Sequence, residues 1–326
     1  MHGTVESLEA ADGQRVAAGD PLVVLEAMKM QHVVEAPAPG VVRRLTVAVG
    51  DTVAEGDLLA RLEPAVVEGE GPAAERPDPA EDLDAIRPDL AEALRRHELV
   101  QDAARPEAVA RRHATGRRTA RENIADLCDP GTFVEYGPLV IAAQRARRPL
   151  QELIERTPAD GLVAGIGEID GEPAMVLSYD YMVLAGTQGA MNHIKKDRMF
   201  ELAERRRLPV VLFAEGGGGR PGDTDTPTVS GLDTMAFHLF ARLSGRVPLV
   251  GIAAGRCFAG NAALLGCCDV VIATRDANIG MGGPAMIEGG GLGVFTPEQI
   301  GPIEVQTRNG VVDLPVADEA EAVAAA

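Results

Sequence analysis

Lys29 stands between two methionines, in Met28-Lys29-Met30, at the junction of two similar halves of an internal repeat. A shift of 37 positions lays residues 3–26 over residues 40–63 without a gap, and 12 of the 24 paired positions are identical. Each half has the pattern of short strands separated by Gly-Asp turns, and the pair predicts a two-fold-symmetric flattened barrel of small sheets. The hairpin that joins the halves would hold the Lys29 amine in solvent, where an enzyme can modify it.

Two glycine-containing stretches form a second candidate site. Gly216-Gly217-Gly218-Gly219 follows the apolar run 209–214, and Ala259-Gly260-Asn261 follows the apolar run 248–253. Because glycine has no Cβ, a ligand can approach its backbone N–H groups closely. Preorganised N–H groups stabilise an oxygen on which negative charge develops. Two such loops occur, and each follows an apolar run typical of a buried strand, so we interpret them as a functional site and not as flexible turns.

Basic side chains gather in two segments although the net charge is −18. They are Arg111, Arg112, Arg117, Arg118, Arg121, Lys195, Lys196 and Arg198. Such a group can bind phosphates. For any one of these residues a solvated surface charge is the commoner role.

Composition narrows the class of protein. A strongly acidic chain is a poor partner for nucleic acid, and no apolar run is long enough to span a membrane. The first residues do not form a secretory signal. The four cysteines form no CxxC pair, which predicts reduced thiols, a cytoplasmic location and no metal site.

The elements that would position these residues fall into three segments. We predict a carrier domain over 1–63, a flexible linker rich in Pro, Ala and acidic residues over 64–88, and an α/β domain over 89–326. In the third segment we expect a first helix capped by Asp89, a second opened by Pro106, and strands at 162–169 and 174–181. A following helix should bury a face formed by Met191, Ile194, Met199 and Leu202. The last residues, 318–326, resemble the start of a helix, so we expect them to belong to a longer chain.

Ala27-Met28-Lys29-Met30 resembles the A-M-K-M attachment site of biotin carrier domains. Lipoyl domains share this barrel, but in their attachment motif Asp and not Met precedes the lysine. The resemblance implies biotin covalently bound to Lys29, between Met28 and Met30, and a biotin protein ligase as the partner that attaches it.

The segment 89–326 resembles the N-terminal, acyl-CoA-binding half of the carboxyltransferase of biotin-dependent acyl-CoA carboxylases. Residues 113–122 are similar to the motif H-x-x-G-K-L-T-A-R-E, and residues 129–135 to D-P-G-S-F-x-E. Residues 209–220 resemble a strand ending in D-S-G-G-A-R, and residues 257–262 resemble C-x-A-G-G-A. The resemblance implies a crotonase-like fold of repeated ββα units.

The same resemblance implies roles for the two glycine loops. Backbone N–H groups of Gly217, Gly218, Ala259 and Gly260 would hold a thioester oxygen as an enolate forms, and no protein base is required. The chain departs from the motifs at Glu215-Gly216, Gly219 and Asn261. Asn261 stands where glycine is usual, and its side chain would donate a hydrogen bond, narrow the acyl pocket or cap the helix. Phosphates of CoA would bind among Arg117, Arg121, Lys195 and Lys196.

The function that the resemblance implies is transfer of a carboxyl group from biotin to the α-carbon of an acyl-CoA. It implies as partners a biotin carboxylase domain or subunit, which uses ATP, bicarbonate and Mg, and the C-terminal carboxyltransferase half of another subunit in a homo-oligomer. Residues 1–326 alone are then predicted to be inactive. The alternatives are a biotin-dependent decarboxylase, a hydratase or isomerase of the same fold that would use Glu215 or Glu288, and a noncatalytic carrier module.

Overall fold

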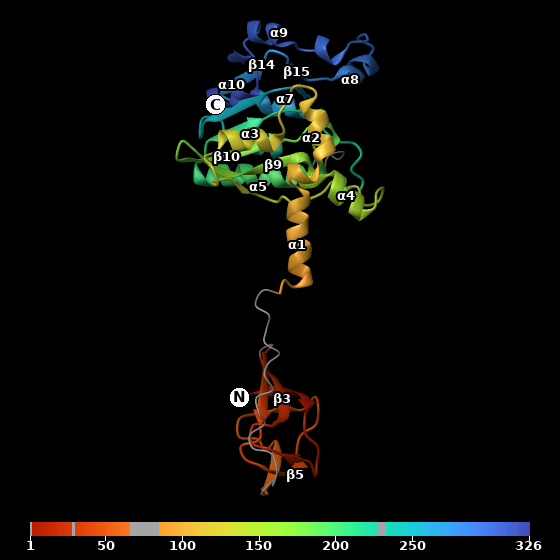
Figure 1. Ribbon diagram of the computed structural model, residues 1–326, viewed down its shortest axis with the longest axis vertical. Coiled ribbons are helices and arrows are strands. Elements are labelled where there is room, and N and C mark those ends of the chain that lie inside the picture. Colours follow the sequence, from red (N-terminus) through yellow and green to blue (C-terminus); the bar gives the residue numbers. More distant parts are fainter. Residues whose placement is uncertain (1, 28–29, 66–84, 227–232) are drawn as a thin grey trace. The chain divides into compact units, whose positions relative to one another are not determined.

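The computed structural model describes residues 2–27, 30–65, 85–226 and 233–326. The chain divides into two compact units, Met1–Ile86 and Arg87–Ala326. Each unit has its own hydrophobic core and is described by itself (Figure 1). Met28, Lys29 and most of the linker expected over 64–88 lie outside the described residues.

The first unit is built from short antiparallel strands in two sheets. The larger sheet has the order β4-β3-β1-β6 and the smaller has the order β2-β5-β7. Both sheets contribute to one core that includes Val5, Val23 and Val42. The strands are β1 (Gly3–Leu8), β2 (Arg15–Val16), β3 (Pro21–Ala27), β4 (Met30–Glu35), β5 (Gly40–Leu45), β6 (Thr52–Val53) and β7 (Ala60–Pro64).

The sequence repeat is reproduced in the backbone of this unit. The pairing of β1 is interrupted between Val5 and Ser7, and that of β5 is interrupted at the equivalent position, between Val42 and Arg44. A Cβ on Gly3 would lie 3.0 Å from the carbonyl oxygen of Glu26, and one on Gly40 would lie 2.6 Å from that of Glu63. These residue pairs are 37 positions apart in the chain. The repeat therefore reflects equivalent local structure in the two halves.

The second unit contains a seven-stranded sheet with the order β16-β14-β12-β11-β10-β9-β8. The strands from β10 to β16 run parallel to their neighbours, whereas β8, β9 and β10 pair antiparallel. A small parallel pair, β13 and β15, forms a separate sheet. The strands are β8 (Val134–Glu135), β9 (Leu162–Ile169), β10 (Glu172–Tyr179), β11 (Val210–Phe213), β12 (Leu249–Ala253), β13 (Arg256–Phe258), β14 (Val270–Thr274), β15 (Asn278–Gly280) and β16 (Leu314–Val316).

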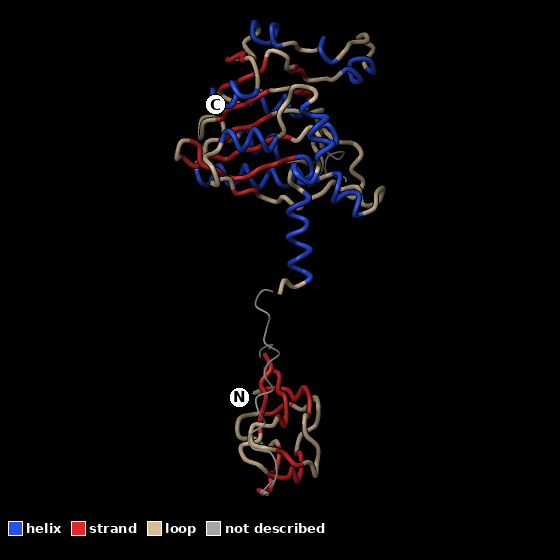
Figure 2. Tube along the Cα trace, in the orientation of Figure 1, coloured by secondary structure: helices blue, strands red, loops and turns tan. Residues whose placement is uncertain are grey.

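Helices cover both faces of this sheet. Figure 2 shows these helices in blue beside the strands in red. Successive residues of a strand point to opposite faces. Accordingly, Leu212 packs in a core with α5, α6 and α7, whereas Val211 packs in a second core with α3 and α10. The helices are α1 (Pro88–Leu99), α2 (Pro106–His113), α3 (Ala120–Leu127), α4 (Leu150–Arg156), α5 (Ala190–Arg206), α6 (Ala236–Ala241), α7 (Gly260–Leu265), α8 (Pro284–Gly289), α9 (Ile303–Arg308) and α10 (Glu319–Ala325). The α/β layers expected for this unit are confirmed.

One sequence prediction about a helix is wrong and another is only partly correct. Helix α1 begins at Pro88 with Arg87 as its N-cap, so Asp89 lies inside the first turn instead of capping it. Proline suits the first helical position because its missing N–H would have no partner there. In α5 the expected apolar face is only partly correct: Met199 is buried and Leu202 packs against the core, but Ile194 is 50% exposed and the helix also buries His193 and Lys196.

The predicted strand 174–181 lies two residues earlier, at Glu172–Tyr179, and the helix expected near 230–243 is described as the shorter α6. The described chain contains no helix of the length and apolar character that a bilayer crossing needs.

Candidate active site

The first glycine loop follows β11 and is held against β13 by backbone hydrogen bonds. The N–H of Gly216 donates to the carbonyl of Arg256 at 2.7 Å, and the N–H of Phe258 donates to the carbonyl of Gly216 at 2.9 Å. Gly216 has a φ of 136°, and a Cβ there would collide with the carbonyl oxygen of Gly186. The serine of the related motif would not fit in this backbone.

The second glycine loop lies directly beside the first. A Cβ on Gly218 would lie 2.5 Å from the Cβ of Ala259, the residue that precedes α7. Ala259 has a φ of 51°, which is unfavourable for a residue with a Cβ, and its N–H donates to the carbonyl of Gly280 at 3.0 Å. The two loops that the sequence places 40 residues apart therefore meet in one site.

The backbone donors of the two loops are not equivalent. Within the described residues, the N–H groups of Gly217, Gly218 and Gly260 have no hydrogen-bond acceptor. Gly260 is the first residue of α7, where the N–H has no partner inside the helix. The N–H of Ala259 is already used, so the prediction that Ala259 offers a donor is wrong. Its role is to shape the turn before α7.

The side chain of Asn261 is fully buried and hydrogen-bonded to three protein groups. Its Nδ2 donates to the carbonyls of Glu215, at 2.9 Å, and Gly186, at 3.3 Å. Its Oδ1 accepts from Nε2 of Gln188 at 3.0 Å. Since both hydrogens of the amide are used, this side chain has none left for a substrate oxygen. It does not cap α7 either.

Lys195 and Lys196 are buried instead of lying on the surface, so both the phosphate-binding role and the solvated role predicted for them are wrong. Nζ of Lys195 donates to the carbonyl of Gly137 at 3.2 Å and to that of Leu162 at 2.5 Å. Nζ of Lys196 donates to the hydroxyl of Tyr179 at 2.8 Å. Burial lowers the pKa of Lys195 to about 8 and that of Lys196 to about 7.

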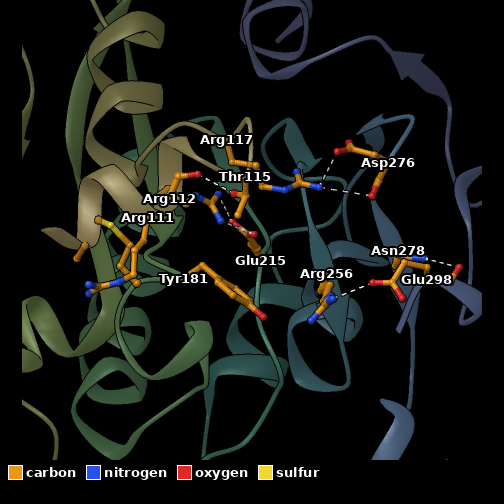
Figure 3. Close-up of a pocket in the computed structure, with 12 residues that line it drawn as sticks. Arg111, Arg112, Thr115, Arg117, Tyr181, Glu215, Arg256, Asp276, Asn278 and Glu298 are labelled. Carbon is orange, nitrogen blue, oxygen red and sulfur yellow. Dashed lines mark hydrogen bonds and ion pairs between the residues drawn. The ribbon is translucent and has the colours of Figure 1, made fainter. Parts of the chain in front are cut away.

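A cavity of about 560 Å³ opens beside Glu215, next to the first glycine loop (Figure 3). Arg117 reaches it and pairs with Asp276 at 2.8 Å, and Arg256 pairs with Glu298 at 2.8 Å. Glycines 217, 218 and 260 do not line this cavity, which is therefore a neighbour of the glycine site and not the same space. Arg121 lies elsewhere and forms a bidentate pair with Glu135.

A buried ion pair that the sequence did not predict borders both the cavity and the first loop. Arg112 binds Glu215 through two hydrogen bonds of 2.9 and 2.7 Å, and both side chains are about 90% buried. Arg112 comes from α2, 103 residues earlier, so spacing along the chain gave no signal of the pair. The departure from Asp to Glu at position 215 was the available clue.

A second unpredicted cluster follows the first loop. Arg220 contacts Asp160 at 2.5 Å and Asp223 at 3.4 Å, and all three side chains are buried. Asp160 lies in a left-handed turn with φ values of 54°, 48° and 72° at residues 159–161. A similar left-handed turn at 184–186 contacts the first glycine loop through Gly186. Unfavourable backbone of this kind gathers at functional sites.

In the first unit, strands β3 and β4 form an antiparallel pair that flanks the predicted attachment residues Met28 and Lys29, which lie outside the described residues. Ala27 and Met30 are paired across the two strands, and residues 28 and 29 connect them. The side chain of Met30 is 60% exposed.

Comparison with known families assigns both units. Residues 111–326 match the carboxyl transferase domain, and residues 1–62 match the biotin-requiring enzyme domain. Among curated proteins, the chain is 33% identical over 181 residues to the methylmalonyl-CoA carboxyltransferase 12S subunit of Propionibacterium freudenreichii subsp. shermanii, with 55% of this chain and 33% of that protein covered. It is 34% identical over 194 residues to the biotin-dependent long chain acyl-coenzyme A carboxylase beta4 subunit of Mycobacterium tuberculosis, covering 57% of this chain and 34% of the relative.

Solved structures extend the similarity to the whole chain. A single-chain, multi-domain long-chain acyl-CoA carboxylase is 56% identical with a TM-score of 0.70, and the match covers 100% of this chain and 31% of that one. The hexameric transcarboxylase 12S core, solved with hydrolysed methylmalonyl-CoA, is 28% identical with a TM-score of 0.62, covering 74% of this chain and 46% of that chain. The chain spans about a third of the length of the first curated relatives and of the carboxylase structure.

Proposed function

Because this chain belongs to the carboxyl transferase domain family and carries a biotin-requiring domain ahead of that domain, we propose that it transfers a carboxyl group between biotin on Lys29 and the α-carbon of an acyl-CoA. The first unit acts as the carrier and the second holds the thioester. Tethering keeps the carrier at a high effective concentration for the site on the same chain. In this assignment the first unit is a biotinyl-type barrel and the second is crotonase-like.

The meeting of the two glycine loops is the observation that carries the proposal. Removing the α-proton of a thioester places negative charge on its carbonyl oxygen. N–H groups of Gly217 or Gly218 on one loop and of Gly260 on the other are available as donors to that oxygen. Donors fixed in advance act without reorganisation, and loss of one such donor costs about 10²–10³ in rate.

Biotin, when attached to Lys29, supplies the carboxyl group and a site that can accept the α-proton. Met30 at the hairpin tip leaves an exposed apolar surface beside such a group. The residues of the second unit then have three tasks, which are to hold the thioester carbonyl, to orient the α-carbon and to limit access of water. No side chain of the described loops has to act as a base.

The cavity beside Glu215 is the proposed place for a phosphate-bearing part of CoA. Arg117, one of the CoA contacts expected from the sequence, borders it, and Arg111, with a side chain 73% exposed, lies beside it. A phosphate would replace Asp276 as the partner of Arg117. Bidentate guanidinium contacts suit phosphate oxygens. We do not extend this role to Arg121, whose guanidinium is held by Glu135.

The proposed partners follow from the relatives. The related 12S core is a hexamer, so we propose a homo-oligomer in which the C-terminal carboxyltransferase half of another subunit completes the site. ATP, bicarbonate and Mg would be used by a biotin carboxylase domain or subunit, and a biotin protein ligase would modify Lys29. The cytoplasmic location stays a prediction.

The same geometry serves a biotin-dependent decarboxylase, because the transfer can run in reverse. A hydratase would need a free carboxylate over the thioester, and Glu215 is instead bound by Arg112. The alternative of a noncatalytic carrier module leaves the unpaired donors of the second unit without a role.

The experiment has two readouts on the chain of residues 1–326. Coexpression with a biotin ligase should add the mass of one biotin, and Lys29→Ala should abolish that addition. Calorimetry with propionyl-CoA should then detect binding that weakens about tenfold in Arg117→Ala, as expected for one lost charged hydrogen bond. Biotin on another residue, or no binding of acyl-CoA by the biotinylated holoenzyme, would refute the proposal.

A further inference from the structure

We propose that the amide pair of Gln188 and Asn261 is a strut that sets the distance between the two oxyanion donors, so that both are positioning residues. This inference rests on the proposed function and concerns the same site. It assigns a role to Asn261, which replaces the glycine of the related motif, and to Gln188, which no sequence motif identified.

Gln188 connects the two loops through different parts of the residue. Its backbone N–H donates to the carbonyl of Gly218 at 2.6 Å, and its carbonyl accepts from the N–H of Arg220 at 2.9 Å. Its side-chain amide donates to Oδ1 of Asn261 at 3.0 Å. One residue thus holds the first loop with its main chain and the second loop with its side chain.

The pair lies directly behind the donor groups. The amide of Gln188 lies 3.2 Å from where a Cβ of Gly260 would be, so Gln188 packs against the residue whose N–H is free. Asn261 follows Gly260 in the chain and ties α7 to the carbonyls of Glu215 and Gly186. Movement of either amide would therefore change the separation of the Gly218 and Gly260 N–H groups.

The strut has no substitute among the described residues. The carbonyls of Glu215 and Gly186 have no other donor there, and Nε2 of Gln188 has no other acceptor. The residues Gly186, Gln188, Glu215 and Asn261 are all buried, so loss of the pair leaves polar atoms without water or protein partners. The loops would relax to satisfy these atoms, and misplacement of about 1 Å is enough to cost 10²-fold in rate.

Two variants remove the strut in different ways. Gln188→Met preserves length and the main-chain bonds but deletes the donor to Asn261. Asn261→Asp preserves size but places a carboxylate oxygen against the carbonyl of Glu215. Asn123→Asp is the control for the same Asn-to-Asp change at another buried amide, because Asn123 donates to Oε1 of Glu319 at 2.9 Å and lies in α3 on the other face of the sheet.

The readout is polarisation of the thioester, which a purely structural defect would not move selectively. Propionyl-CoA labelled with ¹³C at its carbonyl is bound to the biotinylated holoenzyme, and the change in carbonyl chemical shift on binding is measured together with Kd. The wild type and Asn123→Asp should show the same downfield shift. Gln188→Met and Asn261→Asp should lose at least half of it, keep Kd within about threefold, and lower by about 10²-fold the kcat of the complete carboxylase assembled with its C-terminal carboxyltransferase half.

The outcomes separate the two proposals. A shift unchanged in Gln188→Met and in any folded Asn261→Asp would overturn the strut and leave the proposed function standing. Absence of a downfield shift in the wild type with propionyl-CoA bound would overturn both, because the donors would then not face the carbonyl. Equal loss of shift in Asn123→Asp would also overturn the strut, since it would trace the effect to general destabilisation.

Discussion

At the scale of single residues, Gly218 and Gly171 have the same backbone conformation in different surroundings. Their φ values are 81° and 80°. A Cβ on Gly218 would meet that of Ala259 at 2.5 Å, whereas a Cβ on Gly171, in the β9–β10 turn, would meet nothing within 4 Å. The two glycines separate the cost of an unfavourable φ from the cost of forcing the glycine loops apart.

In the complete enzyme, assembled with the C-terminal carboxyltransferase half, we expect Gly218→Ala to lower kcat for carboxyl transfer by about 10²–10³-fold, because displacement of the loop removes an oxyanion donor. Gly171→Ala should lower stability by about 1 kcal/mol and leave kcat unchanged, since only the left-handed conformation opposes it. Steady-state kinetics and urea unfolding of both variants are the measurements. Equal kcat values in the two variants would contradict the placement of the donors.

Lys196 predicts a dependence of stability on pH. Burial lowers its pKa in the folded protein to about 7, while the unfolded chain keeps the ordinary value near 10.5. Between these values the unfolded state binds more protons, so this residue makes stability rise with pH by up to about 1.4 kcal/mol per unit. Urea unfolding between pH 7 and 9 should therefore show a steeper rise for the wild type than for Lys196→Met. Arg198→Met, an exposed site on the same helix, is the control and should follow the wild type.

The sequence was enough to locate the glycines of the candidate site, but not to identify the hydrogen-bond partners of the residues around them. The motifs located Gly217, Gly218 and Gly260, because glycine at a close approach is visible in a sequence. They could not show that the N–H of Ala259 is used by Gly280, a contact that depends on the pairing of β13 with β15. Nor could they show that Lys196 points inward, since lysine in a sequence favours the surface.

At the scale of elements, α3 begins with a capping box that also ties it to another segment. The hydroxyl of Thr119 accepts from the N–H of Glu122 at 3.0 Å and donates to Asp102 at 2.6 Å. The carboxylate of Glu122 accepts from the N–H of Thr119 at 2.7 Å. Thr296 forms a capping box of the same type at the exposed 3₁₀ turn Pro297–Gln299.

We expect Thr119→Ala to cost about 1–2 kcal/mol of unfolding free energy, because it leaves the N–H of Glu122 at a buried helix end without its acceptor and removes one of the two partners of Asp102, which keeps Arg105. Thr296→Ala should cost less, about 0.5 kcal/mol, because water can replace the lost bond. Chemical denaturation of the two variants tests the difference. A Thr119→Ala protein as stable as Thr296→Ala would show that the cap of α3 does not anchor this end of the helix.

Elements were predictable where pattern and end signals agreed. The strand Leu162–Ile169 has the predicted bounds, and Pro106 opens α2 as expected. The burial of α5 was not predictable from apolar spacing, because its inward face carries His193, Lys195 and Lys196 beside Met199 and Phe200. Hydrogen bonds to main-chain carbonyls make Lys195 compatible with burial, and a hydrogen bond to Tyr179 does so for Lys196.

At the scale of the whole molecule, the division at residues 86 and 87 gives two units with separate cores. We expect calorimetry of the intact chain to resolve two transitions. Leu22→Ala should lower the midpoint temperature of only one transition, and Leu212→Ala that of only the other, because these leucines are buried in different cores. Each substitution should cost the affected unit about 2–5 kcal/mol of unfolding free energy. A single transition that both substitutions lower equally would show that the units unfold together.

Gly3 is equivalent to Gly40, and the two interrupted strands are equivalent to each other, so the two halves of the first unit meet the same local constraints. Each half therefore serves as an internal control for the other in a mutational library. Paired positions that tolerate the same replacements are constrained by the shared backbone. Paired positions that tolerate different replacements identify constraints that only one half meets.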